Sequence, residues 1–178
     1  MASTTTQEFN LEMTNVPREY VKDMLRGLLH SIFFHRLLVN VAPRELRVLN
    51  TTVSITDSQE IETLIEQKIA EFLQNTNSSQ IKQGKLAVLF YEKRLKKNWF
   101  HFTKDKPKAT RWMENQLSQC LLTILKIVNE HKEHIPSITT TEGNPFPYQI
   151  AIQSQTESWG TMIKRMLVTD PPNNSGPL

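Results

Sequence analysis

The 178-residue chain has a single cysteine, Cys120, and only five glycines. One cysteine forms no internal disulfide framework and no cysteine-based zinc site. The glycines do not form a GxGxxG motif, a P-loop or a nucleophile elbow, so neither a phosphate-cradling loop nor an activated serine is indicated. We therefore expect a protein that is not an enzyme and carries no cofactor.

Long hydrophobic runs are also absent. No stretch approaches the roughly 18 to 20 apolar residues that span a bilayer, and the first residues lack the basic and apolar regions of a signal peptide. We expect a cytoplasmic protein without a transmembrane segment. The length suits one domain, predicted over residues 1–170, and the Pro-, Asn- and Ser-rich residues 171–178 predict a disordered tail.

Two histidines have a spacing at which both could bind the same metal ion. His131 and His134 lie three apart near the predicted end of a helix, but no further cysteine or acidic motif completes a coordination shell. Histidines are favoured at a helix C-terminus by its partial negative charge. No metal site is expected, and Cys120, within an apolar stripe, is expected to be a buried hydrophobe.

Apolar periodicity predicts alternating strands and helices. Strands are expected at Phe9–Met13, at Leu46–Ile55 as one bent strand or a short hairpin, at Leu86–Tyr91, and at Tyr148–Ile152. Helices are expected at Arg18–Leu38, after two overlapping capping boxes (Thr56 with Gln59, Asp57 with Glu60), after Pro107 as far as about Pro136, and around Trp159–Leu167. This order predicts an α+β fold, a mixed sheet covered by helices.

The third predicted helix is apolar over much of its circumference. One stripe comprises Met113, Leu117, Cys120, Leu121, Ile124, Leu125 and Val128, while Leu122 and Ile127 lie off it. A helix that is apolar on more than one side is either central in its domain or partly covered by another chain.

The segment 92–111 is basic and contains three large aromatics. Eight basic residues against two acidic ones give it a charge of +6, so the rest of the chain sums to −3. Trp99, Phe100 and Phe102 lie among lysines without helical or strand periodicity, which predicts an exposed loop. Such a loop could stack on nucleic-acid bases, anchor a protein partner, or fold its aromatics back onto the sheet.

Four stretches in order resemble the HORMA-domain family, in its autophagy branch. They are 21–36 (VKDMLRGLLHSIFFHR), 89–94 (LFYEKR) with Trp99-Phe100, 127–136 (IVNEHKEHIP), and 147–152 (PYQIAI) with 160–167 (GTMIKRML). The resemblance implies a HORMA fold, a mixed sheet with three main helices packed on it and a short C-terminal helix.

The resemblance also implies a function without catalysis. Such a chain would be a regulatory scaffold subunit of the autophagy-initiation kinase complex, recruited to the phagophore assembly site. It would form a heterodimer with the HORMA domain of autophagy-related protein 13 through its third helix, where we expect Leu122, Lys126 and Ile127 to face the partner. A Trp-Phe finger would recruit downstream autophagy factors, here through Trp99 and Phe100, with Phe102 sharing the second role.

Two alternatives remain open from the sequence. The basic aromatic segment 92–111 could make the chain a nucleic-acid-binding module, in which case binding would weaken steeply with salt. The chain could also be a checkpoint-type HORMA adaptor that binds an extended peptide, although the connection 137–147 is short for the mobile belt that traps peptides in that group.

Overall fold

The computed structural model describes residues 7–37, 42–77, 84–91, 97–105, 110–131, 147–153 and 156–168. Its elements are, in chain order, β1 (Gln7–Thr14), α1 (Arg18–Arg36), β2 (Pro43–Val48), β3 (Thr51–Thr56), α2 (Gln59–Asn75), β4 (Leu86–Tyr91), β5 (Lys97–Asp105), α3 (Thr110–Glu130), β6 (Tyr148–Ile152) and α4 (Trp159–Val168). The predicted α+β class is confirmed. The predicted tail lies outside the described residues.

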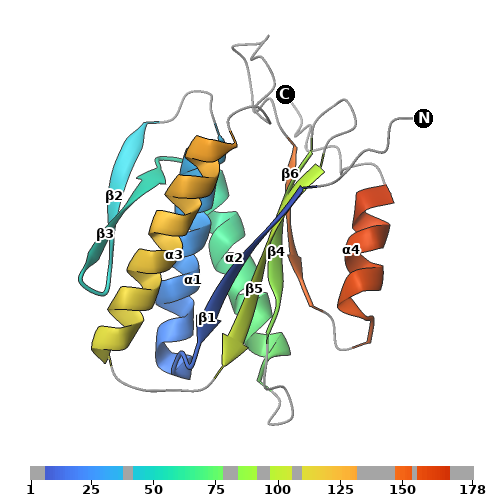
Figure 1. Ribbon diagram of the computed structural model, residues 1–178, viewed down its shortest axis with the longest axis horizontal. Helices are drawn as coiled ribbons and strands as arrows, with labels where there is room; N and C mark the ends of the chain where they lie inside the picture. Colours follow the sequence, from blue (N-terminus) through green and yellow to red (C-terminus); the bar gives the residue numbers. More distant parts are fainter. Residues whose placement is uncertain are drawn as a thin grey trace.

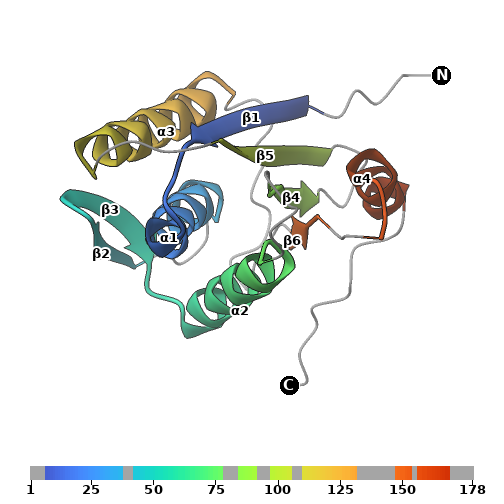
Figure 2. The same ribbon diagram turned by 90° about the horizontal axis from the view of Figure 1, so that it is seen from below.

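Two sheets are present in the described part of the chain. The larger has the strand order β1-β5-β4-β6, with β1 parallel to β5 and the other pairs antiparallel, so it is a mixed sheet as expected. The smaller is the β2–β3 hairpin. The four-stranded sheet lies between α1, α2 and α3 on one side and α4 on the other, while the hairpin lies beside α1 and α3 (Figures 1 and 2).

The main core fills the space between the sheet and the first three helices. On the sheet, Phe9, Val88 and Ile150 are buried within it, and β4 pairs Val88 directly with Ile150. The most enclosed helix is α1, where Met24, Leu28 and Leu29 have no exposed surface. In the described part of the chain, α1 is therefore the centre of the packing.

A second, smaller core lies on the opposite face of the sheet. Ala87 and Leu89 alternate with the main-core residues of β4 and pack, together with Ala151 of β6, against Met162 and Ile163 of α4. This alternation shows that the predicted strand β4 is buried on both faces, an arrangement for which a continuous apolar run such as Leu86–Tyr91 is typical. It also confirms the short amphipathic C-terminal helix.

Several local predictions are corrected by the structure. The Leu46–Ile55 region is a hairpin whose two-residue turn is Leu49-Asn50, so the bent-strand alternative is wrong. The N-cap of α2 is Ser58, whose hydroxyl accepts a hydrogen bond from the Ile61 amide at 3.4 Å, and neither overlapping capping box forms as predicted. Thr, Asp and Ser are all favourable N-cap residues, so the choice of Ser58 depends on where the helix starts.

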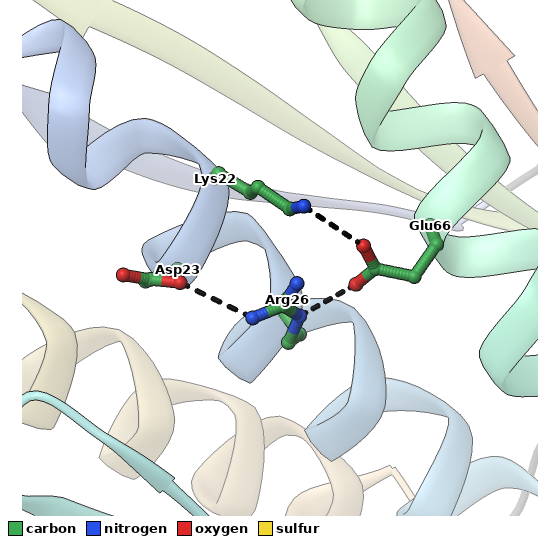
Figure 3. A network of polar contacts seen from close by, with 4 residues as sticks. All are labelled: Lys22, Asp23, Arg26 and Glu66. Atoms are coloured by element: carbon green, nitrogen blue, oxygen red, sulfur yellow. Dashed lines mark hydrogen bonds and ion pairs between the residues drawn. The ribbon is translucent and has the colours of Figure 1, made fainter.

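An ion-pair network fastens α1 to α2 on the solvent side of the main core (Figure 3). Glu66 of α2 accepts from the Lys22 ammonium at 3.2 Å and from Arg26, which also pairs with Asp23 at 3.2 Å. The Arg26 hydrogen bond holds the pKa of the Glu66 carboxyl below its usual range. Because these side chains are partly exposed, the network contributes modestly to stability and mainly fixes the relative orientation of the two helices.

Candidate docking surface on helix α3

One flank of α3 is attached to the open edge of β1. The Gln116 side-chain amide accepts a hydrogen bond from the Thr14 N–H and donates one to the Thr14 carbonyl, both at 2.8 Å. One turn further on, the Cys120 thiol makes a weak contact with the Glu12 carbonyl at 3.9 Å. Among the described strands, none pairs with the edge of β1 that faces away from β5, so the helix covers an edge that would otherwise attract another strand.

The opposite flank of α3 contacts the hairpin turn. The Asn50 side-chain amide donates to the Glu114 carboxylate at 2.6 Å. Leu49, which precedes it, has φ of 55°, a conformation that non-glycine residues rarely adopt, and its side chain packs against the main core. Core packing and the Asn50 bond together hold this turn against α3.

The inward side of α3 carries the predicted apolar stripe. Met113, Leu117, Cys120 and Ile124 are buried, as expected. Ile127 is also buried, at 9% exposure, so its predicted place on the partner-facing side is wrong. At about 100° per residue, Ile127 lies close to Cys120 and Ile124 on the helix circumference.

The outward side of α3 exposes two leucines. Leu122 is 57% exposed, as its position off the stripe indicated, and Leu125 is 46% exposed although it was assigned to the stripe. Leu125 is one residue beyond Ile124 in the direction of Leu122, a shift that a helical-wheel count would have shown. The two side chains, with the partly buried Leu121 beside them, form an exposed apolar patch, the candidate docking surface.

The docking surface is almost uncharged. Lys126 is exposed and forms a long ion pair with Glu130, 3.8 Å between Nζ and Oε1, so the two charges cancel. From Trp112 onward, the other exposed side chains of α3 are polar and uncharged: Asn115, Gln119, Thr123 and Asn129. A leucine pair surrounded by neutral polar groups suits a partner with an apolar, uncharged surface.

The predicted aromatic loop is a strand. Trp99, Phe100 and Phe102 lie in β5, which pairs with β1 on one edge and β4 on the other. The register aligns position 99 with Glu8 and Leu89, and position 100 with the main-core residues Phe9 and Val88. Positions 99 and 100 therefore belong to opposite faces of the sheet, and the nucleic-acid alternative loses the loop on which it depended.

The described residues show little that could support catalysis or metal binding. No group of three or more His, Cys, Asp or Glu side chains that could hold a metal occurs among them. Burial raises the pKa of the Cys120 thiol to about 11, which disfavours the reactive thiolate. The His131 ring contacts the Phe9 ring at an interplanar angle of 51°, with centroids 4.7 Å apart, while His134 lies outside the described residues.

In the portion of the chain that can be described, no helix is both long enough and apolar enough to cross a membrane. The residue that sequence reasoning missed most clearly is Gln116. Its role depends on a strand more than a hundred residues away, and a lone glutamine in a helix carries no local signal for such a contact.

Comparison with known proteins gives the relationship directly. A family model described as autophagy-related protein 101 matches residues 13–112, more than half of the chain. A protein of that name from Schizosaccharomyces pombe is 27% identical over 165 residues, covering 84% of this chain and 89% of its own length. One from Arabidopsis thaliana is 26% identical, covering 88% and 92% respectively. The chain belongs to the autophagy-related protein 101 family, and its role is in autophagy.

Proposed function

We propose that this chain is a non-catalytic regulatory scaffold of the autophagy-initiation kinase complex, with a HORMA fold. In this proposal it forms a heterodimer with the HORMA domain of autophagy-related protein 13 through the outward side of α3. It acts in the cytoplasm and is recruited with that complex to the phagophore assembly site. The family membership and the mixed sheet with three helices on one face support this assignment.

The observation that carries the pairing is the exposure of Leu122 and Leu125 on a helix held at both flanks. Together the two exposed fractions equal about one fully exposed leucine side chain. Burying that much apolar surface contributes about 1.5–3 kcal/mol, or roughly a 10- to 100-fold gain in affinity. Because Gln116 and Glu114 already position α3, the partner meets this surface without ordering it first.

The test is to mix the chain with the HORMA domain of autophagy-related protein 13 and measure the complex by size-exclusion chromatography with light scattering. A 1:1 complex is expected. Leu122→Ala with Leu125→Ala should then raise Kd by roughly 10- to 100-fold, from the lost burial. Gln67→Ala is the control, since Gln67 is exposed on a different helix, α2, and should leave Kd unchanged.

A neutral surface also predicts how the complex responds to salt. Because Lys126 and Glu130 cancel, Kd should change little between low and physiological ionic strength. No complex from a well-folded chain would contradict the pairing. An unchanged Kd in the double leucine variant would place the interface elsewhere on the molecule.

We further propose that Trp99 and Phe100, with Phe102, recruit downstream autophagy factors. The family membership and the +6 charge of segment 92–111 support this recruiting role. The strand pairing of β5 restricts it, because neighbouring positions on a strand belong to opposite faces and Trp99 and Phe100 would not act from the same face of the sheet. Trp99→Ala and Phe100→Ala should be measured singly, by unfolding and by co-precipitation of autophagy factors. Lost recruitment in both, with unchanged unfolding, is expected of a finger; unfolding of either would assign that residue to the core.

A further inference from the structure

His30 is a buried histidine on the side of α1 where two other elements meet. Its residue exposure is 2%, and its Nδ1 atom is buried without a hydrogen-bond partner in the described part of the chain. One turn earlier, Arg26 pairs with Glu66 of α2. Next to it, Gly27 lies so close to the hairpin that an added Cβ would come within 3.2 Å of the Val48 side chain. At about 100° per residue, His30 lies between Arg26 and Gly27 on the helix circumference, and thus where α1 meets both α2 and the hairpin.

Four charged groups act on the His30 ring. Glu62 and Glu66 of α2 favour its protonated form, whereas Arg26 of α1 and Arg44 of β2 disfavour it. Among the described residues, no charge of α3, which also packs against α1, acts on this ring. A positive charge on the ring would therefore be attracted by α2 and repelled by the hairpin.

Glu62 exerts the largest of the two attractions and is also the carboxylate that is not yet engaged. Glu66 already pairs with Arg26, whereas none of the ion pairs between described residues includes Glu62. On the hairpin, Arg44 pairs with Asp57 at 2.9 Å. Both of these side chains are about half exposed, so solvent weakens their pairing and Arg44 still repels a positive ring.

The ring is neutral at pH 7, because burial lowers the pKa of His30 below its ordinary value of 6.5. Protonation would place a charge without a partner between the helices and the hairpin, and the ring could gain a partner only by moving towards α2. We propose that protonation of His30 releases the β2–β3 hairpin from α1 while α1 and α2 stay packed together. Because Asn50 of the hairpin turn bonds Glu114, the release would also remove the hairpin's support from that flank of α3.

The test is amide hydrogen exchange of the chain alone at pH 7.5 and pH 5.5, so its outcome does not depend on the pairing proposed above. A released hairpin restores the ordinary pKa of the ring, and the equilibrium constant for opening should rise as pH falls below about 6.5, by up to about 10-fold at pH 5.5. Protection in β3, corrected for the intrinsic exchange rate, should fall by that factor. Its exchange at pH 5.5 should depend only weakly on added urea, since release exposes less surface than global unfolding, whereas exchange in α2 should keep the steep urea dependence of global unfolding.

Two histidine variants separate this ring from other titrating groups. His30→Gln keeps a polar side chain but takes up no proton, so protection in β3 should be the same at the two pH values. His35→Gln is the matched control. His35 is also a partly buried histidine of α1 with a lowered pKa, but it lies about 140° from His30 around the helix, so this variant should respond to pH like the wild type.

Two carboxylate variants keep the proposal testable even if His30→Gln does not fold. Glu62→Gln removes the attracting carboxylate, so release should begin at a lower pH than in the wild type. Glu60→Gln changes an exposed carboxylate of the same helical turn that does not act on the ring, and should leave the onset unchanged.

Three results would overturn the proposal. The first is exchange of β3 and α2 with one shared urea dependence at pH 5.5, which would mean that His30 affects only the stability of the whole fold. The second is a pH response of β3 that is absent from the wild type or equally large in His30→Gln. The third is an onset that is the same in Glu62→Gln and Glu60→Gln.

Discussion

The contact between Gln116 and the backbone of Thr14 gives the sharpest test of how the fold is held together. Its amide makes two hydrogen bonds of 2.8 Å to one residue of an edge strand, in opposite directions. A carboxyl group of the same size reproduces only one of them. The substitution Gln116→Glu thus removes a single donor with almost no change in shape.

The expected magnitude follows from the bonds lost. A typical hydrogen bond contributes about 0.5–1.5 kcal/mol net, so Gln116→Ala should lower the free energy of unfolding by about 1–3 kcal/mol. Gln116→Glu at pH 7 loses one bond and directs a charged oxygen at the Thr14 carbonyl, for a similar total of about 2 kcal/mol. For a chain of this size that corresponds to a decrease in Tm of about 4–8 °C.

The pH dependence separates the hydrogen bond from simple packing. When protonated, the introduced carboxyl can donate to the Thr14 carbonyl, so its pKa is raised in the folded state above the unfolded value of about 4.3. The folded variant then binds more protons than the unfolded one, and its deficit relative to wild type shrinks as pH falls from 7 towards 4.5.

Urea unfolding of wild type, Gln116→Ala and Gln116→Glu at pH 7 and pH 4.5 measures these differences. Gln119→Ala is the control, since Gln119 is exposed on the same helix and should change stability by less than about 0.5 kcal/mol. A Gln116→Ala variant as stable as this control would refute the reasoning. So would a Gln116→Glu deficit that is identical at the two pH values.

Two further predictions concern α1 and α2. His30 is 2% exposed, and burial lowers its pKa below 6.5, so the unfolded chain is protonated at a higher pH than the folded chain and the free energy of unfolding falls as pH drops below about 6.5. In urea unfolding at pH 7.5 and pH 5.5, His30→Gln should lose less unfolding free energy between the two pH values than the wild type does. An equal loss in the two proteins would contradict this. At Gly84, an added Cβ would meet the Phe72 ring and lie 2.8 Å from the Thr76 methyl, so Gly84→Ala should cost about 1–3 kcal/mol; an unchanged Tm would show that the ring moves freely.

The sequence was sufficient where a periodic pattern faced a single environment. The stripe from Val21 to Phe33 predicted α1 and its burial, and the unbroken run of β4 predicted a strand covered on both faces. Both predictions are confirmed because the apolar residues of α1 and β4 pack against buried residues of the two cores. Family resemblance then indicated a mixed sheet, which the parallel pairing of β1 with β5 confirms.

The sequence was insufficient where tertiary pairing decided the structure. The segment around Trp99 has four lysines nearby and no apolar alternation, yet β1 and β4 bind it from both edges, so backbone hydrogen bonds supply what side-chain pattern does not. Ile127 and Leu125 were assigned to the wrong sides of α3 for a different reason. At about 100° per residue, Ile127 lies close to Cys120 and Ile124, whereas Leu125 lies towards Leu122, so the error was in the spacing count and not in the tertiary structure.

In the proposed pairing, α3 would both cover the edge of β1 and bind a partner, and the same contacts make these two roles compatible. A helix that covers a strand edge uses one flank, and here the hairpin turn occupies the other, so a partner can reach only the narrow side that carries Leu122 and Leu125. That side is fixed by bonds at Glu114 and Gln116, near the start of the helix, whereas the leucines lie two turns further on. If the proposed pairing holds, the edge-covering contacts set the angle at which the leucines are presented, and weakening them would loosen the interface without touching a single interface residue.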